Sequence, residues 1–195
     1  MDAVVVSVNV ARPRAVEWRG RRVTTAFFKE PRAGPCRAGP EGLEGDQVGD
    51  PRVHGGPRKA VYAYPSEHYP FWESELGASR LPWGSFGENL TLRGVTESDV
   101  RPGDRLDVGT ARLEVTRSRT PCYKLNVRFD RDDMVRRFAR AARPGFYLAV
   151  IRSGTLAAGD RVRVVAGKVP GPTVRERFLD EVRGPVDPSA ELDDP

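Results

Sequence analysis

The stretch that decides the fold class is Arg105-Leu-Asp-Val-Gly-Thr-Ala-Arg-Leu-Glu-Val-Thr-Arg117. Apolar and polar residues alternate on both sides of Gly109-Thr110, which is the period of a strand with one buried face. A two-residue break that contains glycine, placed between two such runs, is typical of a β-hairpin. The sequence therefore predicts two antiparallel strands, at residues 105–108 and 111–117.

Strand-like runs continue on both sides of this hairpin. They are rich in β-branched and aromatic residues, and turns separate them because glycine (20) and proline (17) recur along the chain. Three other segments space their apolar residues as helices do. The expected strands are 3–10, 22–28, 59–64, 89–92, 146–152 and 161–165, and the expected helices are 65–76, 130–142 and 173–182.

Many short strands with two or three short helices predict a mainly β or α+β domain, built as a β-barrel. We expect a long loop over 30–57, which holds most of the early glycine and proline, and a turn over 153–160. A chain of 195 residues has room for one main domain. We assign residues 1–168 to the barrel and 169–195 to a short helix and an acidic, proline-rich tail.

Basic residues exceed acidic ones, 32 against 27, which gives a net charge of +5, and all but four of the basic residues are arginine. Two explanations stay open. One is the base composition of the source genome, and the other is recognition of phosphate or another anion, which guanidinium groups bind well. Acidic residues are interspersed among the basic ones, so nucleic-acid binding is the weaker interpretation.

Composition also bears on location. No stretch approaches the roughly 20 apolar residues of a membrane-spanning helix, so we expect no membrane partner. The N-terminal apolar run is short and has no basic segment before it, so we expect no signal peptide. Cys36 and Cys122 are too few for a disulfide framework. These observations predict a reducing, cytoplasmic location.

Three segments contain residue types suited to ligand binding or catalysis. The first joins Gly42-Leu-Glu-Gly-Asp46 to Val53-His-Gly-Gly-Pro-Arg-Lys59. A His-Gly-Gly loop that runs into a strand gathers backbone N–H groups able to hold an anion. Arg58 and Lys59 add positive charge beside it. The alternative is a tight glycine turn with a surface histidine.

The second segment is Phe86-Gly-Glu-Asn-Leu90. Its glycine allows close backbone approach, and the Asn89 amide donates and accepts hydrogen bonds at once. Taken alone, this segment is better explained by a strand-entry turn capped by its own asparagine.

The third segment is Arg117-Ser-Arg-Thr-Pro-Cys-Tyr-Lys-Leu-Asn126. Cationic neighbours at Arg119 and Lys124 favour the thiolate of Cys122, which is both a nucleophile and a soft metal ligand. The alternative is a buried, inert cysteine. We expect Cys36 to be incidental in a flexible loop, with a smaller chance that it approaches Cys122 as a resolving thiol.

Histidines offer little further chemistry. The chain has two, His54 and His68, so we do not expect a multi-histidine zinc site. His68 is as consistent with a structural role as with a functional one.

Taken together and in this order, the segments resemble the MOSC (molybdenum cofactor sulfurase C-terminal) domain family, and most of all its YiiM-type stand-alone branch. Tyr64-Pro-x-Glu-His-Tyr69, Val95-Thr-Glu97 and Gly103-Asp104 add to the resemblance, which covers residues 1 to about 165. It implies a barrel-like fold with a pocket for the molybdenum cofactor, a pterin that bears a phosphate and a dithiolene-bound metal.

The family's cysteine falls on Cys122, so the resemblance makes this residue the protein ligand to molybdenum and the catalytic residue. A thiolate suits such a metal. Arginine and lysine side chains would bind the cofactor phosphate, and loop amides its pterin edge. The residues that would line the cofactor are His54, Gly55, Gly56, Arg58, Lys59, Asn89, Arg119 and Lys124.

Relatives are associated with reduction of N-hydroxylated compounds to amines, so the resemblance implies a small N-hydroxylated substrate, such as a hydroxylamine or an N-hydroxylated base. The chain has no flavin, iron–sulfur or nicotinamide motif, so the resemblance also implies an external electron-transfer reductase. Members of this branch often continue into a three-helix domain, to which only 173–182 corresponds here.

Three alternatives stay open. In the first, Cys122 carries a persulfide and passes sulfur onward. In the second, the protein holds the molybdenum cofactor for delivery without catalysing a reaction. The third is a basic nucleic-acid-binding barrel, which we do not expect. The sequence leaves open whether the protein is a monomer or a homodimer.

Overall fold

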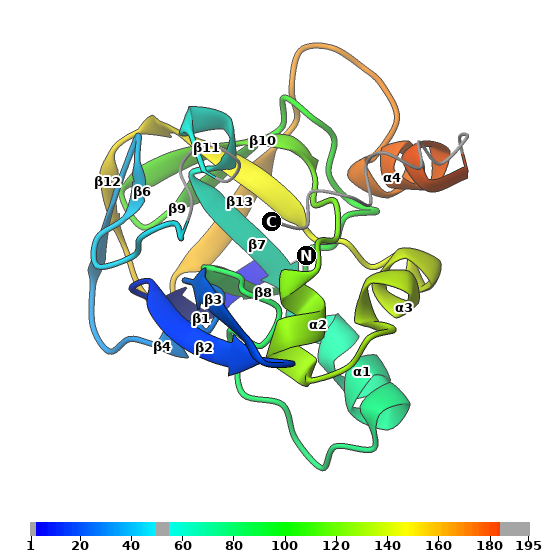
Figure 1. The fold of residues 1–195 in the computed structure, drawn as a ribbon. Coiled ribbons are helices and arrows are strands. Elements are labelled where there is room, and N and C mark those ends of the chain that lie inside the picture. The colour runs from blue at the N-terminus through cyan, green and yellow to red at the C-terminus, as the bar shows by residue number, and fades with distance from the viewer. Residues whose placement is uncertain (1–2, 50–54, 184–195) are drawn as a thin grey trace.

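A computed structural model describes residues 3–49 and 55–183, and in it seven strands close into a barrel (Figure 1). The ring closes because β1 pairs with β13, with Ala3 opposite Val162. β4 (Glu30–Pro31) adds to the other end of β1. In order around the ring the strands are β13 (Arg161–Val165), β9 (Arg105–Val108), β10 (Ala111–Ser118), β11 (Phe146–Arg152), β7 (Val61–Pro65), β8 (Leu90–Arg93) and β1 (Ala3–Val10).

The predicted hairpin is confirmed in β9 and β10, which pair antiparallel with Leu106 opposite Leu113. Alternate residues of these strands, among them Val108 and Val115, are buried in the barrel core. The side chains between them are less buried, as the period-two pattern requires. The mainly β or α+β barrel expected from the sequence is thus confirmed.

A second, aromatic core lies where the helices cover one side of the barrel (Figure 1). The rings of Tyr64 and Phe86 stack with centroids 4.6 Å apart, and Trp72 Nε1 donates to the Tyr64 hydroxyl at 2.6 Å. Phe138 stacks on Trp72 at 5.9 Å. The described residues form four α-helices, against two or three expected: α1 (Tyr69–Leu76), α2 (Lys124–Phe129), α3 (Met134–Ala141) and α4 (Val174–Arg183).

Several predicted boundaries are wrong. The segment predicted as a strand from residue 59 starts with the 3₁₀ turn η1 (Pro57–Lys59), and the helix predicted from 65 starts with the 3₁₀ turn η2 (Ser66–His68). The strand predicted over 22–28 ends at Thr25 as β3 (Arg21–Thr25). It pairs with β2 (Arg14–Trp18), which the sequence did not reveal.

The expected loop over 30–57 and the expected turn over 153–160 also contain strands. β5 (Cys36–Gly39) lies between β6 (Gly42–Leu43) and β12 (Gly154–Leu156). Leu156 of β12 stands opposite Cys36. Because the partner is more than a hundred residues away in the chain, local pattern gave no sign of this pairing.

Helix α4 packs against the barrel. Val174 N donates to Val100 O at 2.9 Å, and Phe178 is buried. The expected tail beyond residue 183 lies outside the described residues. Within the described part of the chain, no helix is both long enough and apolar enough to cross a membrane.

Gly145 provides a test of the packing between β11 and β7. Its φ is +62°, and a Cβ there would lie 2.5 Å from Ala63 O and 2.8 Å from Tyr64 Cδ2. We expect Gly145→Ala to lower the free energy of unfolding by about 3 kcal/mol or more, because backbone strain and overlap add together. Urea unfolding followed by tryptophan fluorescence measures this change.

Gly159→Ala is the matched control for that variant. Gly159 has φ +91°, but a Cβ there meets nothing within 4 Å, so only the conformational cost of about 1 kcal/mol remains. Equal destabilisation by the two variants would contradict the packing described here.

Candidate functional site

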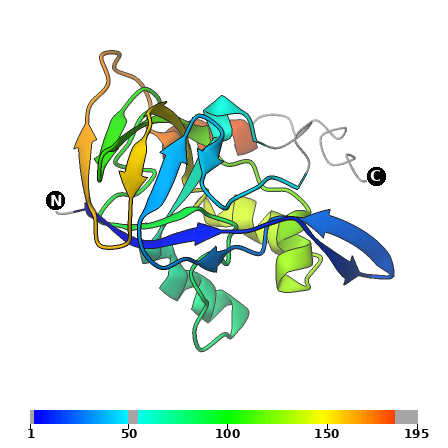
Figure 2. The ribbon, with the colours of Figure 1, turned by 90° about the vertical axis from the view of Figure 1, so that its left-hand side faces the viewer.

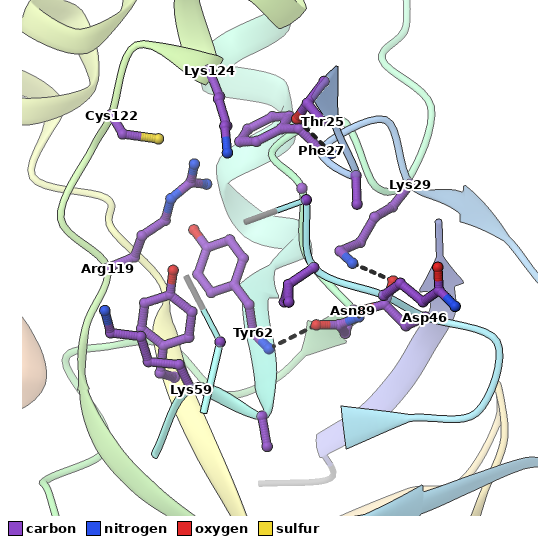
Figure 3. Close-up of a pocket in the computed structure, with 18 of the residues that line it drawn as sticks. Thr25, Phe27, Lys29, Asp46, Lys59, Tyr62, Asn89, Arg119, Cys122 and Lys124 are labelled. Atoms are coloured by element: carbon purple, nitrogen blue, oxygen red, sulfur yellow. Dashed lines mark hydrogen bonds and ion pairs between the residues drawn. The ribbon is translucent and has the colours of Figure 1, made fainter. Parts of the chain in front are cut away.

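A cavity of about 810 Å³ opens beside the barrel, where segments from distant parts of the chain meet (Figure 3). Its wall is formed by residues that follow β3, by the segment from Asp46 to Gly49, by η1, by Tyr62 of β7 and by the link between β10 and α2. A volume of this size is typical of pockets that bind small molecules or cofactors.

The structure brings most of the predicted site residues to this cavity. One exception is Arg58, which is exposed and does not line it, while its carbonyl accepts a hydrogen bond from Thr116 Oγ1 at 2.6 Å. His54 lies outside the described residues. The predicted residues that do line the cavity are Gly55, Gly56, Lys59, Asn89, Arg119, Cys122 and Lys124.

Cys122 stands on the link between β10 and α2 and is partly exposed. Figure 3 shows its sulfur turned toward the space that the side chains of Arg119 and Lys124 also enter. Leu125 N donates to Cys122 O at 3.0 Å, so the start of α2 fixes the backbone at this position. This placement contradicts the alternative of a cysteine sealed in an apolar interior.

Arg119 carries a buried positive charge beside that thiol, with only 4% of the residue exposed. One guanidinium nitrogen donates to Phe86 O, and the group lies 4.9 Å from the ring centroids of both Phe27 and Tyr62. Ring faces attract a desolvated guanidinium. The contacts of Arg119 among the described residues are with a carbonyl and aromatic rings and not with a carboxylate. Its charge is therefore able to attract an anion in the cavity.

Glu88 fixes the conformation of the segment 86–90. The carboxylate is fully buried and accepts hydrogen bonds from Gly84 N at 2.8 Å and Phe86 N at 3.0 Å. The hydroxyls of Tyr69 and Thr91 also donate to it. Burial raises the pKa of Glu88, and these donors oppose the shift. The loop that they hold presents the Phe86 carbonyl to the Arg119 side chain.

A second charged group, which sequence reasoning missed, lies across the cavity from Cys122 (Figure 3). Lys29 Nζ forms an ion pair with Asp46 Oδ1, and their side chains are only 9% and 10% exposed. Burial lowers the pKa of Lys29, and the Asp46 carboxylate offsets part of that shift. Asp46 ends the Gly-Leu-Glu-Gly-Asp segment, whereas no sequence motif marked Lys29.

Asn89 joins this pair to the barrel. Its Nδ2 donates to Asp46 Oδ2 at 2.8 Å, and its Oδ1 accepts from Tyr62 N at 3.0 Å. The side chain therefore bridges β7 and the cavity wall, which contradicts the alternative that it caps its own turn.

Two other residues considered in the sequence lie away from the cavity. Cys36 is buried in β5, with Sγ 3.5 Å from Arg32 Nη1, so the expectation of a flexible loop is wrong. Burial also raises the pKa of its thiol. His68 is buried, with Nε2 2.9 Å from the Glu97 carboxylate and Nδ1 2.9 Å from Arg143 Nη1, as suits a structural role.

The family comparison and the individual relatives point to one and the same family. The family model described as MOSC domain matches residues 50–163. "Uncharacterized protein YflK" of Bacillus subtilis is 37% identical over 162 residues, which cover 83% of this chain and 73% of that protein. A protein of Gibberella moniliformis named "Reductase" is 32% identical over 154 residues, which cover 77% of this chain and 27% of that protein.

The crystal structure of YiiM from Geobacillus stearothermophilus superimposes with a TM-score of 0.76 at 32% identity, covering 92% of this chain and 84% of that one. The matched model spans more than half of the chain, and the solved relative has the same fold. This chain therefore belongs to the MOSC domain family, in its YiiM-type branch.

Proposed function

We propose that this protein binds the molybdenum cofactor and reduces N-hydroxylated compounds to amines with electrons from a separate reductase. The observation that carries the proposal is the placement of Cys122. A partly exposed thiol opens into a cofactor-sized cavity beside a buried guanidinium that has no acidic partner among the described residues. Membership of the MOSC family supports it.

The residues that line the cavity fit a metal that is already held by the sulfur ligands of its cofactor. Within residues 3–49 and 55–183, no group of three His, Cys, Asp or Glu side chains is placed to hold a bare metal ion. A pterin dithiolene would supply two sulfur ligands itself, so one protein thiolate, that of Cys122, would be enough to attach the metal to the chain. Cys122 is the cysteine that lines the cavity, and Cys36 lies elsewhere.

The residues that line the cavity differ in the part of the cofactor or substrate that each would contact. Arg119, Lys124 and Lys59 would hold the cofactor phosphate, because charge-assisted hydrogen bonds to phosphate are strong. Backbone N–H groups of Gly55 and Gly56 and the side chain of Asn89 would meet the pterin edge. The Lys29–Asp46 pair is already neutralised, so it suits the uncharged part of the cofactor or the substrate.

The proposed reaction converts an N-hydroxy group, two electrons and two protons into an N–H group and water. The N–O bond breaks, nitrogen is reduced and gains a proton, and oxygen leaves as water. When bound, the cofactor supplies the two-electron redox chemistry. This chain's residues would bind the anionic parts and hold the Cys122 sulfur toward the cavity.

The electron donor is a second protein in this proposal, and the setting that best suits it is the cytoplasm. The name "Reductase" of the Gibberella moniliformis relative supports a redox role for the region that it shares with this chain.

Substitution of Cys122 tests the cofactor assignment. We expect Cys122→Ser to lose the molybdenum that wild-type protein carries after expression in a cofactor-producing host, because a hydroxyl is a poor ligand for such a metal. Metal analysis of freshly purified protein measures this loss. The matched control is Cys36→Ser, which we expect to retain molybdenum because Cys36 does not line the cavity.

Equal molybdenum in both variants would contradict the role of Cys122. A wild-type protein without molybdenum, but with a reductant-sensitive sulfur adduct on Cys122 seen by intact mass, would point to sulfur transfer instead.

Catalysis distinguishes an enzyme from a cofactor carrier. We expect molybdenum-loaded wild-type protein to reduce a hydroxylaminopurine to the aminopurine with reduced methyl viologen as donor, and Cys122→Ser to fall to the rate without protein. Product formation followed by chromatography measures the reaction. Retained molybdenum with no turnover of any N-hydroxylated compound would favour the carrier.

A further inference from the structure

A two-stranded arm, residues 12–25, projects from the body of the barrel (Figure 2). It consists of β2 and β3, which pair with Arg14 opposite Thr25 and Trp18 opposite Arg21. The strands join through Arg19 and Gly20, both with positive φ, as a tight hairpin turn requires. The arm forms a sheet separate from the barrel, and apart from Thr25 at its base none of its residues lines the cavity.

The arm is strongly basic. Residues 12–25 contain five arginines and a single acidic residue, Glu17. Arg12, Arg14, Arg19, Arg21 and Arg22 are all exposed. Charge of one sign on a projecting element creates a local field that attracts an oppositely charged partner.

The base of the arm is fixed to the cavity wall. Ala11 N donates to Asp46 Oδ1 at 2.8 Å, and Gln47 N donates to Ala11 O at 2.9 Å. At the other end of the hairpin, Thr25 itself lines the cavity. The arm therefore extends directly from the rim of the candidate site.

Two contacts hold the arm in place along its length. Arg19 at the turn forms an ion pair with Asp132, with nitrogen and oxygen 2.5 Å apart. The Arg14 guanidinium lies 4.4 Å from the centroid of the Phe28 ring, and the Arg128 guanidinium lies 5.1 Å from it. A docking partner thus meets a surface that is already oriented, which reduces the entropy cost of binding.

We propose that this arm is the docking surface for an acidic electron-transfer protein that supplies the cavity with electrons. The inference rests on the proposed function, which requires a separate electron donor. A donor seated on the arm is beside the cavity rim, and its acidic face complements the arginines. Interfaces of this kind are weak and transient, and their association rates depend on charge.

The alternative partner for a basic arm is nucleic acid. The observations favour a protein, because the Arg19 guanidinium lies 5.4 Å from the Trp18 ring and Arg21 stands opposite Trp18. Trp and Arg dominate the energetic centres of protein interfaces. The arm is also attached to the cavity wall, so a partner docked on it lies beside the cavity.

The test reverses charge at Arg12 and Arg22, which are exposed and do not line the cavity. The matched control is Arg93→Glu with Arg161→Glu. Both residues are exposed and pair with Val4, at the end of β1 away from the arm. Molybdenum-loaded proteins reduce a hydroxylaminopurine with either of two donors: an acidic [2Fe–2S] ferredoxin kept reduced by its own reductase, or reduced methyl viologen.

We expect R12E/R22E to lower kcat/KM for the ferredoxin at least about tenfold at low salt, with the difference shrinking as salt rises. The control variant and all rates with methyl viologen should stay close to wild type, since the small radical cation of reduced methyl viologen needs no basic docking surface. Unchanged ferredoxin kinetics would overturn the proposal. An equal loss with both donors would also overturn it, because the arm would then act on the cavity itself.

Direct binding separates failure of the docking surface from failure of the proposed function. If wild-type protein reduces no substrate with either donor, titration with oxidised ferredoxin still tests the docking surface. Binding that is lost only in R12E/R22E supports the docking surface. No binding by wild-type protein overturns it. Loss of binding to a single-stranded oligonucleotide, with ferredoxin binding unchanged, would assign the arm to nucleic acid.

Discussion

The parallel pairing of β7 with β8 constrains everything around the cavity. All other strand pairs in the described chain are antiparallel, whereas Ala63 pairs with Leu90 in parallel register. Parallel neighbours need a crossover connection. Here the crossover carries η2, α1 and the loop around Glu88, so the aromatic core and the start of β8 come together at the candidate site. Asn89 is brought beside Tyr62 by the same pairing.

Buried charge then gives the cavity two unlike sides. On one side, the Asp46 carboxylate neutralises Lys29. On the other, aromatic rings and the Phe86 carbonyl surround Arg119 without cancelling its charge. A buried cation of this kind is costly unless an anion meets it, so the Cys122 side of the cavity favours an anionic group. The opposite side offers polar but neutral contacts.

The basic arm extends this asymmetry to the surface. It begins at Ala11, whose backbone is bonded to Asp46 and Gln47, and it returns at Thr25 in the cavity wall. The proposed cofactor site and the proposed docking surface therefore share one stretch of backbone. The proposed function gives this connection a purpose, because in it the electrons arrive from another molecule.

The sequence by itself determined the β9–β10 hairpin, most other barrel strands, the family and the importance of the Cys122 segment, because alternation, turn residues and short motifs are local properties. Only the tertiary structure decided that Cys36 is buried in a strand paired with β12, that Arg58 does not line the cavity, and that Lys29 faces Asp46. Each of these depends on partners far apart in the chain, and single-sequence patterns carry no information about which distant segments meet when a barrel closes.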